Sequence, residues 1–155
     1  MRRLALDTNL LILLVVGQVS RRLISEHRRL RSYSEGDYEL LTETLSKFQR
    51  LIVTPNSATE TSNLINDGWR DPYRSRLRAV LGGILAGSDE HYEPSASICL
   101  TPEFRRLGLT DAVWLKVLDS HTVLLTDDGE LYVAALQIDI KAYKFSHVRQ
   151  LRALN

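Results

Sequence analysis

LALDTNLLILLVV, residues 4–16, is the stretch that decides how the rest of the sequence is interpreted. A short apolar run ends at one carboxylate, Asp7, and an almost wholly apolar segment follows it. Because both flanks must be buried, Asp7 is expected at the edge of the core, where a charge is costly unless it is paired or bound to a cation. The stretch therefore leaves two roles open for Asp7, a helix cap or a metal ligand.

The composition is that of an ordinary globular protein. The 155 residues are 44% hydrophobic and 25% charged, with a formal net charge of +1. They predict one domain over residues 1–155, and the net charge argues neither for nor against nucleic acid. The single cysteine, Cys99, excludes an internal disulfide framework and a multi-cysteine zinc site. It fits a reducing compartment and is expected to be a small buried hydrophobe.

The apolar run at residues 10–16 predicts neither a membrane span nor a signal peptide. It is far shorter than the roughly 20 residues that a span requires. Asp7 and Asn9 interrupt the stretch after the first basic residues, and no small-residue cleavage site follows. We therefore expect a cytoplasmic protein with no membrane partner.

Short apolar strands alternate with helical segments along the chain. Strands are expected over residues 3–6, 51–53, 122–125 and 138–145, the last of them nearer a sheet edge. Helices are expected over residues 10–16 (ended by Gly17), 20–31, 38–48, 55–66 (starting near Pro55 or at Ser57), 71–86, 110–118 and 130–136, with 147–154 as a last helix or a tail. Residues 87–102 are expected to be irregular, with a short extended piece at 97–100. This alternation predicts an α/β fold with a parallel sheet covered on both faces.

Acidic residues occur where such sheets bind ligands, outside the carboxyl ends of the strands. Asp7 ends the first strand, Glu60 follows the second, Asp111 opens the helix that leads into the third, and Asp127-Asp128 follows the third. Each acid also has a purely structural interpretation: an N-cap, a capping box over residues 57–60, a helix-dipole partner or a turn residue.

The acids are more informative together than singly. Carboxylates brought to one edge repel one another, so the site is tolerable only if protons or cations offset their charge. Oxygen ligands without cysteine pairs suit hard cations such as Mg²⁺ or Mn²⁺. These cations bridge phosphate oxygens and lower the pKa of a bound water. Metal-assisted phosphodiester hydrolysis follows as a hypothesis.

In order and spacing, these segments resemble the PIN-domain nucleases, above all the VapC-like toxin ribonucleases. The matching segments are LALDTN at 4–9, Thr54-Pro55 with Glu60, TDA at 110–112 and LLTDD at 124–128. The resemblance implies a PIN-like three-layer fold, with a central parallel sheet of four to five strands and helices on both faces. It also implies a Mg²⁺- or Mn²⁺-dependent endoribonuclease acting on single-stranded or structured RNA. Dimerisation, or neutralisation by a small antitoxin in a toxin–antitoxin pair, would follow from the same resemblance.

By motif, the resemblance assigns the catalytic and metal-ligating roles to Asp7, Glu60, Asp111 and Asp128. Asp128 is selected as the fourth acid because it lies two residues after the strand-end threonine; Asp127 is the close alternative. The further residues expected to contact substrate or to orient Asp7 are Thr8, Asn9, Thr126, Arg28 and Arg29.

Arginines supply a possible guide for an RNA backbone. Residues 21–31 contain the densest positive cluster, and Arg105-Arg106 forms a second pair. A solvated helix face and a phosphate-contacting surface both remain open for the first cluster.

Two other functions remain as alternatives. One is a PIN-like scaffold that binds RNA or protein without catalysis, although no acid position is replaced; the other is a DNA-directed nuclease of the same fold. The chain is longer than a compact VapC-like toxin, with the extra length around residues 28–37 and 88–102. These segments are expected to set substrate choice or to contact a partner other than a VapB-like antitoxin.

Overall fold

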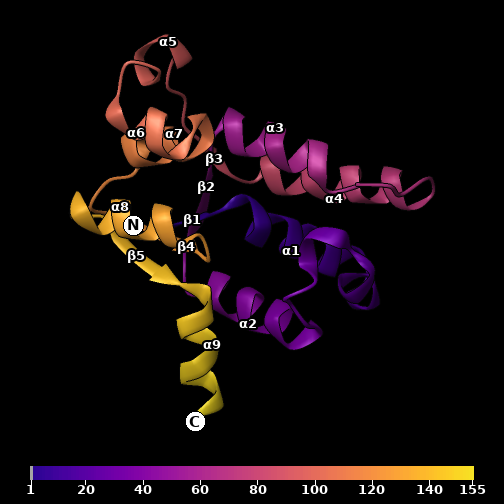
Figure 1. Ribbon diagram of the computed structural model, residues 1–155. Coiled ribbons are helices and arrows are strands. Elements are labelled where there is room, and N and C mark those ends of the chain that lie inside the picture. The colour runs from indigo at the N-terminus through magenta and orange to yellow at the C-terminus, as the bar shows by residue number, and fades with distance from the viewer. Residues whose placement is uncertain (1) are drawn as a thin grey trace.

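The computed structural model describes residues 2–155, which form an α/β structure around five parallel strands (Figure 1). The strands are β1 (Arg3–Leu6), β2 (Arg50–Val53), β3 (Asp89–Glu90), β4 (Thr122–Thr126) and β5 (Lys141–Lys144). Their order across the sheet is β3-β2-β1-β4-β5, and every neighbouring pair is parallel. The predicted α/β fold with a parallel sheet is confirmed, and β5 lies at a sheet edge as expected.

Helices make up most of the remaining chain. The α-helices are α1 (Thr8–Val19), α2 (Glu35–Leu45), α3 (Pro55–Leu64), α4 (Tyr73–Ala86), α5 (Ser95–Ile98), α6 (Pro102–Leu107), α7 (Leu109–Val117), α8 (Gly129–Gln137) and α9 (Phe145–Ala153). Two 3₁₀ segments, η1 (Arg21–Glu26) and η2 (Arg28–Leu30), follow α1. No helix within residues 2–155 is long and apolar enough to cross a membrane.

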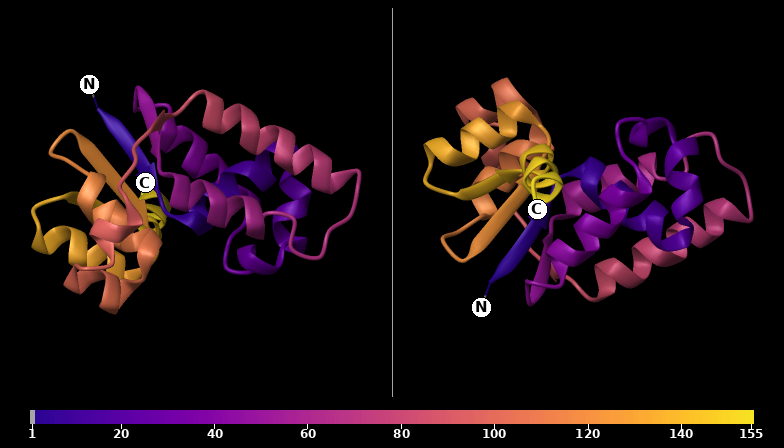
Figure 2. Two further views of the ribbon diagram at one scale, coloured as in Figure 1. Left: turned by 90° about the horizontal axis from the view of Figure 1, so that it is seen from above. Right: turned by 90° about the horizontal axis from the view of Figure 1, so that it is seen from below.

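The sheet separates two apolar layers because successive side chains of a strand point to opposite faces. Leu4 and Leu6 of β1 pack into a cluster with α1, α2 and α4, whereas Ala5 packs into a second cluster with α7 and α8. Figure 2 shows these two groups of helices on either side of the strands. Helices therefore cover both faces, as the alternation in the sequence predicts.

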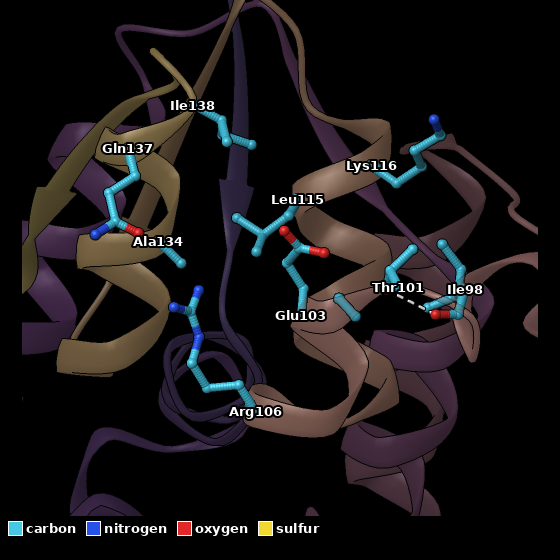
Figure 3. Close-up of a pocket in the computed structure, with 10 residues that line it drawn as sticks. Ile98, Thr101, Glu103, Arg106, Leu115, Lys116, Ala134, Gln137 and Ile138 are labelled. Carbon is cyan, nitrogen blue, oxygen red and sulfur yellow. Dashed lines mark hydrogen bonds between the residues drawn. The ribbon is translucent and has the colours of Figure 1, made fainter.

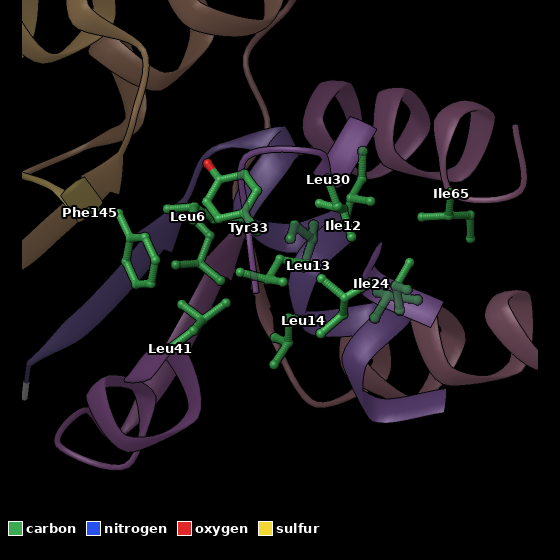
Figure 4. Packing of buried hydrophobic residues seen from close by; sticks show 14 of the residues in the cluster. Leu6, Ile12, Leu13, Leu14, Ile24, Leu30, Tyr33, Leu41, Ile65 and Phe145 are labelled. Atoms are coloured by element: carbon green, nitrogen blue, oxygen red, sulfur yellow. The ribbon is translucent and has the colours of Figure 1, made fainter. Parts of the chain in front are cut away.

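Helix α1 is the centre of the larger layer. Its residues from Leu10 to Gly17 are all buried, and Figure 4 shows several of them packed around Leu6 and Leu41. The prediction that Gly17 ends this helix is wrong. Gly17 lies inside α1, where a Cβ atom would come within 2.2 Å of the Tyr38 ring, so glycine is needed for the close approach of α2.

Three other local predictions are also wrong. Residues 20–31 form no α-helix, because His27 is extended and its ring nitrogen accepts a hydrogen bond from the backbone N–H of Arg29, which divides the segment into η1 and η2. The extended piece expected at 97–100 is instead the end of α5 and the turn after it. Cys99 is exposed, because α5 turns only Ile98 inward.

Candidate active site

The strand order reverses beside β1, which is where open parallel sheets form a ligand crevice. From β1 the chain proceeds through β2 to β3 on one side, and then returns to place β4 against the other side of β1. Asp7 directly follows β1, and Asp127 and Asp128 directly follow β4. Because β1 and β4 are parallel, these acids emerge at the same edge of the sheet.

The carboxylate of Asp7 is almost fully buried and is bound through both of its oxygens. Oδ1 accepts a hydrogen bond of 2.9 Å from the backbone N–H of Leu10, which caps α1. Oδ2 accepts from the Thr126 hydroxyl and, at 2.9 Å, from the backbone N–H of Asp127. Burial is the main cause that raises the pKa of Asp7 above its ordinary value. Asp7 therefore takes the N-cap role, one of the two roles left open for it, and also ties the end of β1 to the end of β4.

Asp127 and Asp128 differ in how much of each carboxylate the protein uses. The oxygens of Asp127 accept hydrogen bonds of 2.8 Å from the Tyr33 hydroxyl and 2.8 Å from the backbone N–H of Ser146. Asp128 accepts one hydrogen bond, 3.0 Å from the backbone N–H of Leu131, and so caps α8. Asp128 is exposed and has a second oxygen without a partner among the described residues. The geometry thus favours Asp128 over Asp127 as the acid that is free to bind a ligand.

Tyr33 holds Asp127 from an unexpected direction. Its ring packs in the core with Phe145, as Figure 4 shows, and its hydroxyl reaches the acidic edge. Burial, together with the negative charges of Asp7 and Asp127, raises the pKa of Tyr33, so the hydroxyl remains a donor. Tyr33 follows an arginine-rich segment with no local motif, and the sequence offered no sign of this contact.

Helices α3 and α7 bring in the other two predicted acids. Glu60 Oε2 accepts a hydrogen bond of 2.7 Å from the Thr110 hydroxyl, which joins the two helices. The capping box considered as a structural role for residues 57–60 does not form, because α3 begins at Pro55, the earlier of the two expected starts, and its box joins Thr54 to Ser57. Glu60 is therefore released from any capping role. Gly108, with a φ of 88°, adopts a backbone conformation that favours glycine immediately before α7 and places Asp111 in its first turn.

Asp111 is strongly perturbed by its surroundings. Its pKa rises from 3.8 to about 7, first because it is buried and then because of the charges of Asp128, Glu60, Asp7 and Glu130. Its side chain makes no hydrogen bond to any residue from 2 to 155 that would stabilise the ionised form. All four predicted acids therefore interact at this edge, and they are joined by Glu130, which the sequence analysis missed although it lies in the first turn of α8.

The donor set fits a hard cation in its chemistry. The acids at this edge supply carboxylate oxygens, which are the ligands that Mg²⁺ and Mn²⁺ prefer. In the part of the chain that the structure describes, no three His, Cys, Asp or Glu side chains are gathered tightly enough to hold a metal ion. The mutual repulsion of the acids, visible in the raised pKa of Asp111, is the cost that a cation would relieve.

Of the residues predicted to contact substrate, some lie at a cavity beside the acids and the others do not. Asn9 and Arg29 line a cavity of about 400 Å³ together with Asp127 and Asp128. Arg28 points elsewhere, with a guanidinium nitrogen 3.6 Å from Asp67. Thr126 is buried against Asp7, where it orients the carboxylate. Thr8 is half-buried at the start of α1.

Arg106 of the second arginine pair lines another cavity. Arg106 lines a space of about 250 Å³ between α6, α7 and α8, with Leu115 and Gln137 among the other lining residues (Figure 3). None of the four predicted acids lines this cavity. The guiding role predicted for Arg105-Arg106 therefore has less geometric support than that of Arg29.

No family model matches the chain, and no curated protein is similar to it in sequence. What can be said of function therefore depends on the residues at this edge of the sheet.

Proposed function

We propose that the chain is a Mg²⁺- or Mn²⁺-dependent endoribonuclease of the PIN-like type that the motifs resemble. The observation that carries the proposal is the juxtaposition of Asp7, Glu60, Asp111 and Asp128 at one carboxyl edge of a parallel sheet, beside the point where the strand order reverses. Clustered carboxylates without cationic partners have a clear use in binding a divalent cation and a phosphodiester.

Asp111, Asp128 and Glu60 would hold the cation, with Asp7 beside them, once their side chains turn closer together than the structure places them. A bound divalent cation would neutralise charge on a phosphate and lower the pKa of a water molecule. Asp7 fixes the geometry, because its hydrogen bonds to Thr126 and to the backbone of Asp127 hold the ends of β1 and β4 together. The free oxygen of Asp128 and the unbonded carboxylate of Asp111 are the groups that can turn toward a ligand.

Asp111 is also the group best placed to exchange a proton near neutral pH. Its pKa of about 7 means that comparable amounts of its acid and base forms coexist there. In the absence of a cation, this partial protonation limits the charge of the cluster. In its presence, the same carboxylate would be ionised and would ligate.

The proposal is tested by incubating end-labelled single-stranded RNA with the protein in Mg²⁺ or Mn²⁺, with a chelator as the blank. Asp111→Asn and Asp7→Asn should each reduce the cleavage rate by about 100-fold or more, a loss of ~3 kcal/mol in transition-state stabilisation. Glu43→Gln is the matched control, because Glu43 is an exposed acid on α2 whose one ion-pair partner within residues 2–155 is Lys47. Equal cleavage by the wild type and both site variants would overturn the proposal.

The same assay separates the alternatives. Single-stranded DNA and a flapped duplex are tested beside RNA, and preferential cleavage of either would assign the site to DNA. An antitoxin partner and a homodimer remain proposals drawn from the motif resemblance alone. Purified wild-type protein that binds RNA but cleaves none of these substrates would instead favour a binding scaffold.

A further inference from the structure

The cavity of about 400 Å³ beside the acidic edge is lined by hydrogen-bond donors from four separate parts of the chain. Asn9 comes from α1, Arg29 from η2, Ser32 from the loop after η2, and Ser146 and Arg149 from α9. Asp127 and Asp128 complete the wall that adjoins the acidic edge. Donors and carboxylates thus share one cavity, with the candidate cation site at its acidic end.

These donors are largely unused by the protein itself. Within residues 2–155, the side chains of Asn9, Ser32 and Ser146 make no hydrogen bond, and no carboxylate lies within 4.0 Å of the Arg29 guanidinium. Other arginines of the same cluster are already engaged: Arg28 with Asp67 and Arg21 with Glu39. Arg22 and Arg31 pair with no carboxylate among residues 2–155 either, so Arg29 is distinguished from its neighbours because it lines the cavity.

Arg149 is held rigidly for the same cavity. Its Nε atom donates a 2.7 Å hydrogen bond to the buried Asp37 carboxylate, and its guanidinium lies 5.7 Å from the ring centres of both Tyr33 and Phe145. The two terminal nitrogens have no partner among the described residues. A guanidinium fixed through one nitrogen presents its remaining donors as a planar fork, the geometry that recognises phosphate oxygens.

The mixed charge of the cavity restricts the ligand. A free anion that entered it would be opposed by Asp127 and Asp128, whereas a free cation would be opposed by Arg29 and Arg149. A ligand that carries phosphate groups in series can place one against the arginines and another against a cation at the acids. A nucleic-acid strand has this character, since its phosphates repeat along the chain.

We propose that Arg29 and Arg149 bind a backbone phosphate of a single-stranded nucleic acid, next to the phosphodiester that lies over the acids. Asn9, Ser32 and Ser146 supply further donors to its oxygens or to the sugar. The inference rests on the proposed function in placing a second phosphate at the acidic edge. It places the nucleic-acid strand at the part of the sheet edge that η2 and α9 border.

The inference is tested by binding rather than by cleavage. Fluorescence anisotropy of a labelled single-stranded RNA is measured with the Asp111→Asn protein, which is expected not to cut it, over a range of salt concentrations. Adding Arg29→Gln should weaken binding by about 5- to 10-fold and should reduce the slope of log affinity against log salt by about 0.7, the value for one phosphate contact on a single strand. Adding Arg28→Gln is the matched control and should change the affinity by less than about two-fold.

Arg149 needs a variant that spares its pairing with Asp37. Arg149→Lys preserves the charge and removes the fork, so it should weaken strand binding while the protein keeps its cooperative unfolding. Inorganic phosphate is a second probe. If the cavity binds a nucleic-acid strand, inorganic phosphate should compete poorly with the labelled RNA, because the cavity also contains two carboxylates. Strong competition by inorganic phosphate would assign the arginines to a free anion and overturn the proposal.

The outcomes separate this inference from the proposed function. If the wild-type protein cleaves RNA and Arg29→Gln leaves the binding affinity unchanged, the phosphate site alone is overturned. A wild-type protein that cleaves nothing but loses strand binding on Arg29→Gln would overturn the nuclease and keep the phosphate site. Equal losses of RNA affinity for Arg28→Gln and Arg29→Gln would show that only the overall positive charge matters, and would also contradict the inference.

Discussion

The acidic edge has two sides that are built on different principles. The strand side, Asp7 with Asp127 and Asp128, follows β1 and β4, and its carboxylates accept hydrogen bonds that hold the fold together. The helix side, Glu60 and Asp111, comes from α3 and α7, where one hydrogen bond from Thr110 is the only one that either carboxylate accepts from residues 2–155. The strand-side carboxylates therefore stabilise the fold before any ligand binds, whereas the helix side carries uncompensated negative charge.

The largest expected effect is the loss of the strand-side hydrogen bonds. Asp7→Ala leaves the Thr126 hydroxyl and the backbone N–H groups of Leu10 and Asp127 without an acceptor. Removal of a buried, desolvated charge offsets part of this cost, so we expect a loss of about 2–3 kcal/mol in the free energy of unfolding. Urea denaturation followed by circular dichroism measures it. An unchanged unfolding midpoint would place Asp7 outside the structural framework and end the distinction between the two sides.

On the helix side, removing the charge of Asp111 should increase the stability of the fold instead of decreasing it. The pKa of Asp111 is about 7 in the folded chain against an ordinary value of 3.8, so between these values the folded state binds more protons than the unfolded state. Stability is therefore lost as pH rises through this window, and the full cost is present above pH 7. One pKa unit corresponds to roughly 1.4 kcal/mol. Solvent screening at this partly exposed group reduces the expected gain from Asp111→Asn to about 1–2 kcal/mol at pH 8.

The pH dependence provides the check on Asp111→Asn. Denaturation of the variant and the wild type in the presence of a chelator should differ at pH 8 and converge below about pH 3, where the carboxyl group is largely protonated in both states. Destabilisation by Asp111→Asn at pH 8 would mean that the carboxylate has favourable partners, contrary to the comparison.

A smaller loss of stability is expected when the hydrogen bond from Tyr33 to Asp127 is removed. Tyr33→Phe removes the hydroxyl that donates to Asp127 and leaves the ring in place. The expected loss is about 1 kcal/mol, the usual net contribution of such a hydrogen bond. Tyr143→Phe is the control, since the Tyr143 side chain is exposed and makes no hydrogen bond within residues 2–155. Equal effects of the two substitutions in thermal denaturation would show that the Tyr33 contact adds nothing.

The smallest effect should come from the single helix-side hydrogen bond. Thr110→Val removes the donor to Glu60 at a half-buried site beside solvent, so we expect a loss of only about 0.5 kcal/mol. Differential scanning calorimetry can compare it with Tyr33→Phe directly. If Thr110→Val proved the more destabilising of the two, the helix side would be held as firmly as the strand side.

The sequence predicted the features that depend on local pattern. Apolar runs identified β1 and β4, and the acids that follow strands were placed at the correct edge because parallel strands end together. Helix ends were predicted less well: Gly17 is inside α1 because Tyr38 of α2 packs on it, a contact that no local pattern reveals. The start of α3 was one that the sequence left open between Pro55 and Ser57, and the structure places it at Pro55, which leaves Glu60 outside the capping box.

Long-range contacts explain what the sequence missed at the site. Tyr33 reaches Asp127 across 94 residues, and Arg149 reaches Asp37 across 112. Neither pair has a spacing that a motif could record, since only the tertiary arrangement brings the segment after η2 and α9 to the acidic edge. The choice between Asp127 and Asp128 likewise depended on which oxygens the folded chain already uses.

Calorimetric titration with Mn²⁺ at pH 8 tests most directly whether the two sides together form a cation site. The wild type and the Glu43→Gln control should bind the ion, whereas Asp111→Asn should bind it at least about 10-fold more weakly, because a carboxylate that has no other partner is removed. Wild-type protein that takes up no Mn²⁺, or an Asp111→Asn variant that binds it as tightly as the wild type, would contradict the account.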